Sequence, residues 1–597
     1  MIRKDSERSR ARPLAVEATP EPAFVPAWPP AETELDRWIT PRAVRFDPAA
    51  GLLAVPVQSH GYHTSLPSGG MAHGTRASAE YAERILLRGD PQDGEQAGRI
   101  IMALARCQVS DPADELAGLW PYYAQEPVAQ MTPPDLNWAD FCGAALATML
   151  ISHAGKLTAE ARTQGTEALV RAAGLIRRRD VGPHYTNIAV LGGVVVAAAA
   201  RLTGDAGLAA YARGRLERIA DAFERDGVSE YNSPVYAIVV VEACETGLHL
   251  VTDEPTRAAL GRVLEGIWLH LAAHFHLPTR QSAGPISRTY ADRVPASFVS
   301  ALAWRTGLVA LPENAKPAVP PLRCSDQVVR LLSRRFERPE TERIRYGGSA
   351  LTGVRDTATG AVWRSATACL GSADYATTYF QSRPVLGFWQ GAADEPVMVR
   401  LRVTSAGNDF GAACVLSDQA DSHVLFAVQL ATNRGDHHPR LSLSPDGVYD
   451  VTDLQAEVFV EGRNLQGFSR ENERGETWLG VSDGLHEVRL LPVPPALGTT
   501  KRAWAVHTHE AGVSLVCRIL PGGHKLAIGE MPPLQLAAAL SLTTPDAPQQ
   551  THPTAGGMTT ETGETQGREE TRQITWMVDD EGRKVLKVDV PVRAFLY

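Results

Sequence analysis

The sequence predicts a multidomain α + β protein, in which an N-terminal α/α toroid of helical hairpins over residues 34–320 is followed by a large antiparallel β-sandwich over residues 321–545. Three observations predict this class. The 597 residues far exceed what one core organises, so two or three domains are expected. Helix-length apolar segments follow one another up to the proline-rich stretch 317–321. Beyond it, the hydrophobic period changes from helical to alternating.

Residues 1–33 combine charges with many prolines, which predicts a flexible N-terminal arm. After the arm, Gly, Pro and Asp residues separate a series of helix-length segments. The segments that we expect to be helical are 78–87, 94–107, 138–153, 158–178, 188–202, 206–225, 236–251, 256–274 and 297–306.

Several of these helices are apolar on more than one face, as residues 189–200 illustrate. A helix of this kind needs cover on both faces, so it belongs to the inner layer of a stacked assembly. Short links between antiparallel helices suit an α-solenoid or a closed α/α toroid. No fixed-period repeat of the tetratricopeptide or ankyrin sort is present, which favours the toroid, with its polar loops converging on one mouth.

The C-terminal half is predicted to be a sandwich because short segments alternate or run apolar between Gly, Asp and Asn turns. The expected strands include 395–403, 423–430, 456–461, 486–491 and 513–520. Residues 546–572, rich in Thr, Gln, Gly and Glu, are expected to be an exposed loop or linker. Within the terminal segment 573–597, two last strands are expected to return to the sandwich.

Charge and composition exclude several classes of function. The net charge is −9, and the basic residues are scattered rather than striped, so we expect no nucleic-acid partner. Seven widely spaced cysteines without a Cys-x-x-Cys pair are typical of buried thiols. The N-terminus lacks the apolar core of a secretory signal, and the longest apolar run, 188–200, is too short to span a bilayer. We therefore expect a soluble, cytoplasmic protein without a membrane partner.

The functional prediction centres on the polar segment 226–236, which lies between two helical stretches. Asp226-Gly227 is a helix stop, and Ser233-Pro234 favours a helix start. The loop between them must hold Glu230, Tyr231, Asn232 and Tyr236 close together at one end of the helical layer. A capped turn with a surface carboxylate is an equally good interpretation of these residues.

Other polar loops also carry more aromatic and hydrogen-bonding residues than a turn needs. Aromatic rings stack on pyranose rings while amides and charges bind hydroxyls, so loops at one end of the hairpins would form a sugar-binding cleft. For each loop alone, helix capping by Asn137 or Asn187 and interfacial packing of the tyrosines remain simpler interpretations. The candidate substrate-binding residues are Asn137, Trp138, Asp140, Tyr185, Tyr231, Asn232, Tyr290, His60 and His63.

Asp226-Gly227, Glu230 and Ser233-Pro234-x-Tyr236 together resemble a stretch of the heparinase II/III-like and alginate-lyase-like polysaccharide lyases. The Asn187 loop and the Ala/Val/Gly-rich helix after it also resemble that group, which combines an α/α toroid with a β-sandwich in this order. The sequence departs from the family pattern at three positions. Ile188 and Ala237 stand where histidines are frequent, and Glu230 falls one residue early. The family's usual histidine therefore has no counterpart.

The resemblance implies β-elimination in a uronate-containing glycan. Asn187 matches the family's neutraliser of the substrate carboxylate, and Tyr236 matches the tyrosine that acts as acid and sometimes as base. Arg288 is a plausible second donor to the carboxylate, because its fork binds a carboxylate bidentately, and its charge would lower the pKa of Tyr236. His184 is the best remaining histidine for proton removal, and Glu230 would orient Tyr236 or Arg288.

Two other functions remain open at this stage. An α/α toroid can also host an inverting glycoside hydrolase, whose two carboxylates lie about 6.5–9.5 Å apart, and Asp140 and Glu230 would be that pair. A non-catalytic carbohydrate-binding protein is the third alternative. No cofactor or metal is expected, since nothing completes a site around His270, His274 and His276. The expected partner is an acidic oligosaccharide or polysaccharide, and homo-oligomers are possible.

Overall fold

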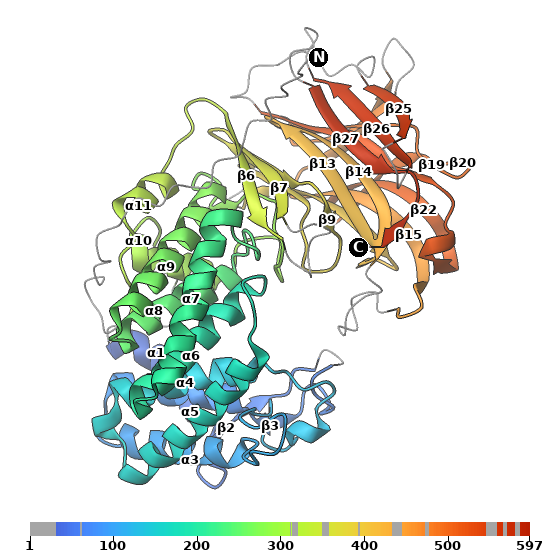
Figure 1. Ribbon diagram of the computed structural model, residues 1–597. Coiled ribbons are helices and arrows are strands. Elements are labelled where there is room, and N and C mark those ends of the chain that lie inside the picture. Colours follow the sequence, from blue (N-terminus) through green and yellow to red (C-terminus); the bar gives the residue numbers. More distant parts are fainter. Residues whose placement is uncertain are drawn as a thin grey trace, which may run out of the picture.

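In the computed structural model, an α/α toroid of helical hairpins is followed by a large antiparallel β-sandwich (Figure 1). The structure describes residues 32–59, 62–310, 312, 320–348, 357–391, 395–432, 444–471, 477–544, 558–564, 570–578 and 585–596. Figure 1 shows the helices in one lobe and the sheets in the other, with β6 and β7 where the two lobes meet.

The helices form two rows. Inner helices pack on one another and on the outer helices that alternate with them along the chain. The inner row is α2 (Thr75–Arg88), α4 (Trp138–Ser152), α6 (Thr186–Thr203), α8 (Tyr236–Leu250) and α10 (Ala296–Thr306). The outer row is α3 (Asp93–Cys107), α5 (Ala159–Arg179), α7 (Ala206–Asp226), α9 (Glu254–His274) and α11 (Asp326–Leu332).

The inner helix α6 illustrates why the apolar sequence segments form this layer. Nearly all its side chains are buried, because α4, α5, α7 and α8 all pack against it. It is long and apolar enough to cross a membrane by length and composition, although 83% of that window is buried inside the protein. The sequence analysis had predicted that the apolar run 188–200 within this helix is too short to span a bilayer. Burial on all sides is what a toroid's inner helix requires.

Several small elements frame the toroid. The N-terminal helix α1 (Glu32–Ala43) packs on α2, so regular structure begins inside the segment expected to be an arm. Residues 1–31 lie outside the described part of the chain. The other short elements are β1 (Phe46–Asp47), β2 (Leu52–Pro56), β3 (Met71–His73), β4 (Phe275–His276), β5 (Gln281–Ser282), and the 3₁₀ turns η1 (Val128–Gln130) and η2 (Ala154–Lys156). A further 3₁₀ turn, η3 (Ile528–Glu530), lies in the sandwich half of the chain.

Two large sheets enclose the sandwich core, and in the described residues one has nine strands and the other eight. The first contains β6 (Glu340–Gly347), β7 (Thr357–Arg364), β8 (Ala368–Ala373), β10 (Val385–Trp389), β11 (Val397–Ser405), β12 (Asn408–Asp409), β15 (Val448–Glu461), β21 (Trp504–His509) and β22 (Gly512–Ala527). The second contains β9 (Ala376–Thr377), β13 (Ala413–Ala420), β14 (His423–Thr432), β16 (Gln466–Glu471), β17 (Thr477–Ser482), β18 (Glu487–Pro492), β24 (Ala537–Thr543) and β28 (Phe595–Leu596).

A third layer covers the outer face of the second sheet. It consists of β25 (Met558–Glu564), β26 (Glu570–Met577) and β27 (Val585–Pro591), and its apolar residues, Trp576 among them, pack on β13 and β14. β25 lies in the segment that the sequence predicted to be a loop or linker. Its polar sequence has no strand pattern of its own, and its strand conformation depends on pairing with β26. A small ribbon of β19 (Ala496–Leu497), β20 (Thr500–Lys501) and β23 (Leu534–Gln535) lies beside the second sheet.

Candidate active site

The loop after α7 is clamped onto the sandwich. Gly227 ends α7 with φ 85° and ψ −179°, a conformation that is essentially restricted to glycine. A Cβ at this position would lie 2.3 Å from the carbonyl oxygen of Arg345 in β6. The next residue, Val228, accepts a backbone hydrogen bond from Gly347. The Asp-Gly helix stop therefore also lets the loop approach the first strand of the second domain.

Two loop residues expected to bind substrate are structural instead. Tyr231 is buried and stacks on Tyr346, with ring centroids 4.1 Å apart. Asn232 is fully buried with φ 48°; its backbone N–H donates to His270 Nε2 at 2.7 Å, and its amide donates to the carbonyl oxygens of Ala283 and Pro285. These contacts hold the loop in place, together with backbone hydrogen bonds such as the one that Tyr231 accepts from Ser287.

Glu230 is the buried anchor of the candidate site. Its Oε2 accepts from the backbone N–H and the side-chain Nδ2 of Asn187, at 2.8 and 2.7 Å. Its Oε1 accepts from Arg288 Nη1 at 2.8 Å. Asn187 lies in the first turn of α6 and is 1% exposed, so its amide serves Glu230 and is not free to meet a substrate carboxylate. The structure therefore places Asn187, the expected neutraliser, against Glu230.

Arg288 connects Glu230 to the surface. Its guanidinium donates to Gln381 Oε1 at 3.1 Å and to the Tyr236 hydroxyl at 3.3 Å, and lies 4.4 Å from the centroid of the Tyr236 ring. Its side chain is 12% exposed. A guanidinium has five N–H donors, and within the described residues three of them serve these side-chain hydrogen bonds, while the Tyr185 hydroxyl also lies within hydrogen-bonding reach of the guanidinium.

The Tyr236 hydroxyl is where the polar groups converge. It accepts from Arg288 and from Gln381 Nε2 at 3.4 Å, and donates to the Tyr290 hydroxyl at 2.8 Å. Burial raises the pKa of Tyr236 well above its usual value, against the opposing effect of the Arg288 charge. Tyr290 is 63% exposed, so the pair provides a hydrogen-bonded path from the half-buried hydroxyl to solvent.

Further aromatic residues continue from this cluster along the inner helix ends. The Tyr185 ring lies 5.3 Å from the Arg288 guanidinium, and its hydroxyl accepts from Asn137 Nδ2 at 3.0 Å. Trp138 follows Asn137 and lies 3.9 Å from the Tyr122 ring. Tyr185, Trp138 and Tyr122 are only partly buried. Asn137 immediately precedes α4 but makes no side-chain cap, so the capping interpretation is not what the structure shows.

The histidines lie apart from the network. His184 is exposed in the turn before α6, where its Nδ1 sits beside Gly182, and in the described residues no hydrogen bond joins it to Tyr236 or Arg288. His63 has φ 66°, and its Nδ1 lies 2.6 Å from the carbonyl oxygen of Pro133. Its ring is 5.7 Å from Tyr122, at the far end of the aromatic row. His60 lies outside the described residues.

Asp140 is a buried structural carboxyl. It is 2% exposed at the start of α4, with Arg179 Nη1 3.7 Å from its Oδ2, and burial raises its pKa to about 7. A hydrolase pair needs two carboxyl groups around a shared water. Asp140 and Glu230, the pair considered for a hydrolase, are both buried, and Asp140 faces Arg179 whereas Glu230 binds Asn187 and Arg288.

The structure does not combine the three histidines considered as metal ligands. His274 Nε2 lies 2.9 Å from the Tyr346 hydroxyl, and His276 contacts Thr279 and the Ser365 carbonyl oxygen. Among the described residues, no group of three or more His, Cys, Asp or Glu side chains could hold a metal ion.

The sequence analysis missed Gln381. It lies between β9 and β10 in the second domain, is 4% exposed, and contacts both Arg288 and Tyr236. The site is therefore completed by the sandwich. Gln381 follows Tyr236 by 145 residues, and no local pattern marks it.

The chain is similar to one family model and to solved structures. A family model described as a domain of unknown function matches residues 56–320, the helical half of the chain. No curated protein sequence matches the chain. A solved structure of the Streptomyces coelicolor A3 chondroitin AC lyase in complex with chondroitin sulphate is similar at 11% sequence identity and a TM-score of 0.33, over 87% of this chain and 98% of the other.

Proposed function

We propose that the protein is a polysaccharide or oligosaccharide lyase that cleaves a uronate-containing glycan by β-elimination. The observation that carries the proposal is the convergence of Arg288, Gln381 and Tyr290 on the Tyr236 hydroxyl. Two N–H donors aimed at one phenolic oxygen stabilise its anion, and the third group gives its proton a route to solvent. This arrangement is suited to moving a proton at Tyr236 Oη.

In this mechanism Tyr236 removes the C5 proton as a phenolate. The C5–H electron pair becomes the C4–C5 double bond, the C4–O4 bond breaks, and O4 receives the proton from Tyr236. One residue therefore acts as base and then as acid on one face of the sugar. This assignment needs no histidine beside the Tyr236 hydroxyl. The described residues that hydrogen-bond to this hydroxyl are Arg288, Gln381 and Tyr290.

The C5 proton is acidic enough only when the neighbouring carboxylate is neutralised. The Arg288 guanidinium suits this task, because it is positively charged and a guanidinium binds a carboxylate through its N–H groups. Glu230 and Asn187 hold Arg288 in orientation from the buried side. An acidic substrate is preferred over a neutral glycan for this reason. The partly buried aromatic row from Tyr185 to Trp138 would stack on neighbouring sugar rings.

The proposal is tested with a panel of uronic-acid oligosaccharides, by following the ultraviolet absorbance of the conjugated uronate that elimination creates. We expect the band to grow with the wild-type protein and to be lost with Tyr236→Phe. Tyr290→Phe is the matched control, since within the described residues its hydroxyl hydrogen-bonds only to Tyr236, and its loss should slow the reaction without abolishing it. Release of reducing ends without the band would reject elimination.

The pH profile separates the two candidate bases. A phenolate base whose pKa is raised gives kcat/KM values that rise tenfold per pH unit without a plateau between pH 7 and 9. A histidine base of ordinary pKa gives a plateau above neutral pH. If His184 were the base, His184→Ala would abolish activity. We expect the rising profile and an active His184→Ala variant.

A further inference from the structure

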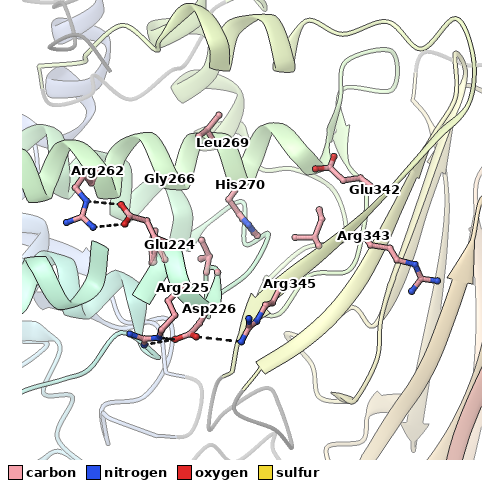
Figure 2. A pocket seen from close by; sticks show the side chains of 14 residues that line it. Glu224, Arg225, Asp226, Arg262, Gly266, Leu269, His270, Glu342, Arg343 and Arg345 are labelled. Atoms are coloured by element: carbon pink, nitrogen blue, oxygen red, sulfur yellow. Dashed lines mark hydrogen bonds and ion pairs between the residues drawn. The ribbon is translucent and has the colours of Figure 1, made fainter. Parts of the chain in front are cut away.

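A separate pocket of about 70 Å³ lies where the helical hairpins meet the first strand of the sandwich (Figure 2). We call it the junction pocket. Its walls come from the end of α7, from α9 and from β6, and the residues lining it do not include Tyr236, Arg288 or Gln381. One water needs about 10–15 Å³ of such a cavity, so the junction pocket can hold several waters or a small ligand.

The base of the junction pocket offers a hydrogen-bond donor from His270. This side chain is 4% exposed, and its Nε2 accepts from the backbone N–H of Asn232. Burial lowers the pKa of His270 to about 3, so the ring is neutral and its proton is on Nδ1. In the part of the chain that the structure describes, Nδ1 has no hydrogen-bond partner. Figure 2 shows the ring extending from α9 toward β6.

The second donor comes from the facing strand. Arg345 in β6 lies 3.7 Å from Asp226, which is an ion pair beyond hydrogen-bond distance. Among the described residues its guanidinium makes no hydrogen bond, and its side chain is 43% exposed. Figure 2 shows Arg345 reaching toward Asp226 at the edge of the junction pocket. Within the described residues, the Arg345 guanidinium is therefore a second donor group at the junction pocket, beside the neutral N–H of His270.

The remaining charges around the junction pocket are already paired. Arg262 binds Glu224 and Asp221, and Arg343 turns toward Asp418. Glu342 accepts from Arg364. Two guanidinium groups, Arg225 and Arg345, then share the single carboxylate of Asp226. Because Arg262 faces two carboxylates, the charges of these groups balance. Arg345 is the arginine among them whose ion pair is longer than hydrogen-bond distance, so its guanidinium can turn to an anionic ligand.

We propose that the junction pocket binds a small oxyanion, a carboxylate or a phosphate, whose oxygens accept hydrogen bonds from His270 Nδ1–H and from the Arg345 guanidinium. This site is independent of the proposed lyase activity. Its ligand would still touch the loop of the candidate active site, because residues 226–228 form one wall and His270 holds Asn232.

The test measures binding of inorganic phosphate and, separately, of acetate to the full-length protein at constant ionic strength set with chloride. Isothermal titration calorimetry gives the affinity. Protein labelled with ¹⁵N in the histidine rings reports whether the Nδ1–H signal of His270 shifts. Arg345→Gln removes the charged donor, and His270→Gln keeps an acceptor for Asn232 while removing Nδ1–H. Arg343→Gln on the same strand is the matched control, since its guanidinium is bonded to Asp418.

We expect saturable binding of at least one of the two anions, with a shift of the His270 Nδ1–H signal. Loss of one charge-assisted hydrogen bond should weaken binding about tenfold to a hundredfold in Arg345→Gln and leave Arg343→Gln unchanged. If His270→Gln does not fold, the calorimetric titration of Arg345→Gln and the His270 Nδ1–H signal of the wild-type protein still test the proposal. Failure of both anions to bind saturably, or equal binding by Arg345→Gln, would overturn the proposal.

Discussion

Glu230→Gln tests the buried link on which the geometry of the candidate site depends. The carboxylate accepts three hydrogen bonds, two at Oε2 from Asn187 and one at Oε1 from Arg288. An amide of the same shape must place its NH₂ group against at least one of these donors. It also leaves Arg288, only 12% exposed, without its counter-ion.

The expected cost follows from these contacts. Removing one partner of a buried ion pair costs about 3–5 kcal/mol, and the slight exposure of Arg288 places this case near 3 kcal/mol. If Arg288 then loses its orientation toward Tyr236, kcat/KM on a uronate substrate should fall by about 10²–10³.

A double-mutant cycle with Arg288→Gln measures the link. In urea unfolding, the double variant should lose about 2 kcal/mol less stability than the two single variants lose together. Each single change leaves the other partner buried without its ion pair, and the double change does not. Additive effects, or a Glu230→Gln variant that unfolds at the wild-type midpoint, would refute the reasoning.

Three more predictions address the loop, the buried carboxyl and the contribution of the sandwich. Gly227→Ala should lower the free energy of unfolding in urea by about 3 kcal/mol, because the backbone is strained and the new Cβ meets the Arg345 carbonyl oxygen. The control Gly204→Ala, at φ 71° with open space around it, should cost about 1 kcal/mol, and equal losses for the two variants would contradict this. The folded-state pKa of Asp140 is raised to about 7, so the folded protein binds the extra proton, and this stabilisation is lost as pH rises from about 4 to 7. The free-energy difference between wild type and Asp140→Asn should therefore change by about 4 kcal/mol over that window, and a pH-independent difference would reject the assignment. Gln381→Leu should lower kcat about tenfold with little change in KM, since Gln381 of the sandwich hydrogen-bonds to both Arg288 and Tyr236 and positions them. An effect confined to KM would assign Gln381 to substrate binding instead.

Much of the fold could be predicted from local sequence signals. The apolar run in α6 and the Asp226-Gly227 stop are visible along the chain, because helix periodicity and glycine conformations are local properties. The polar strand β25 could not be predicted, since its order depends on pairing with β26. Helix α1 was also missed; it contains Pro41, which argues locally against a helix.

The candidate site could be predicted only in part. Sequence position placed Glu230, Tyr236, Arg288 and Asn187 near one another, and the structure brings them into one hydrogen-bonded network. What each side chain faces was not visible from the sequence. Tyr231 and Asn232 occupy the same polar loop as Glu230, yet both are buried, Tyr231 against Tyr346 of the sandwich and Asn232 against groups of the helical half. Only the folded chain reveals which loop residues turn inward.

The measurement that tests the central claim most directly is mass spectrometry of the products formed from a defined uronate oligosaccharide in H₂¹⁸O. Elimination takes no atom from water, so the fragment masses should add up to the substrate mass, carry no ¹⁸O, and disappear with Tyr236→Phe. Fragments that together gain one ¹⁸O-labelled water, or fragments that persist in Tyr236→Phe, would contradict the account.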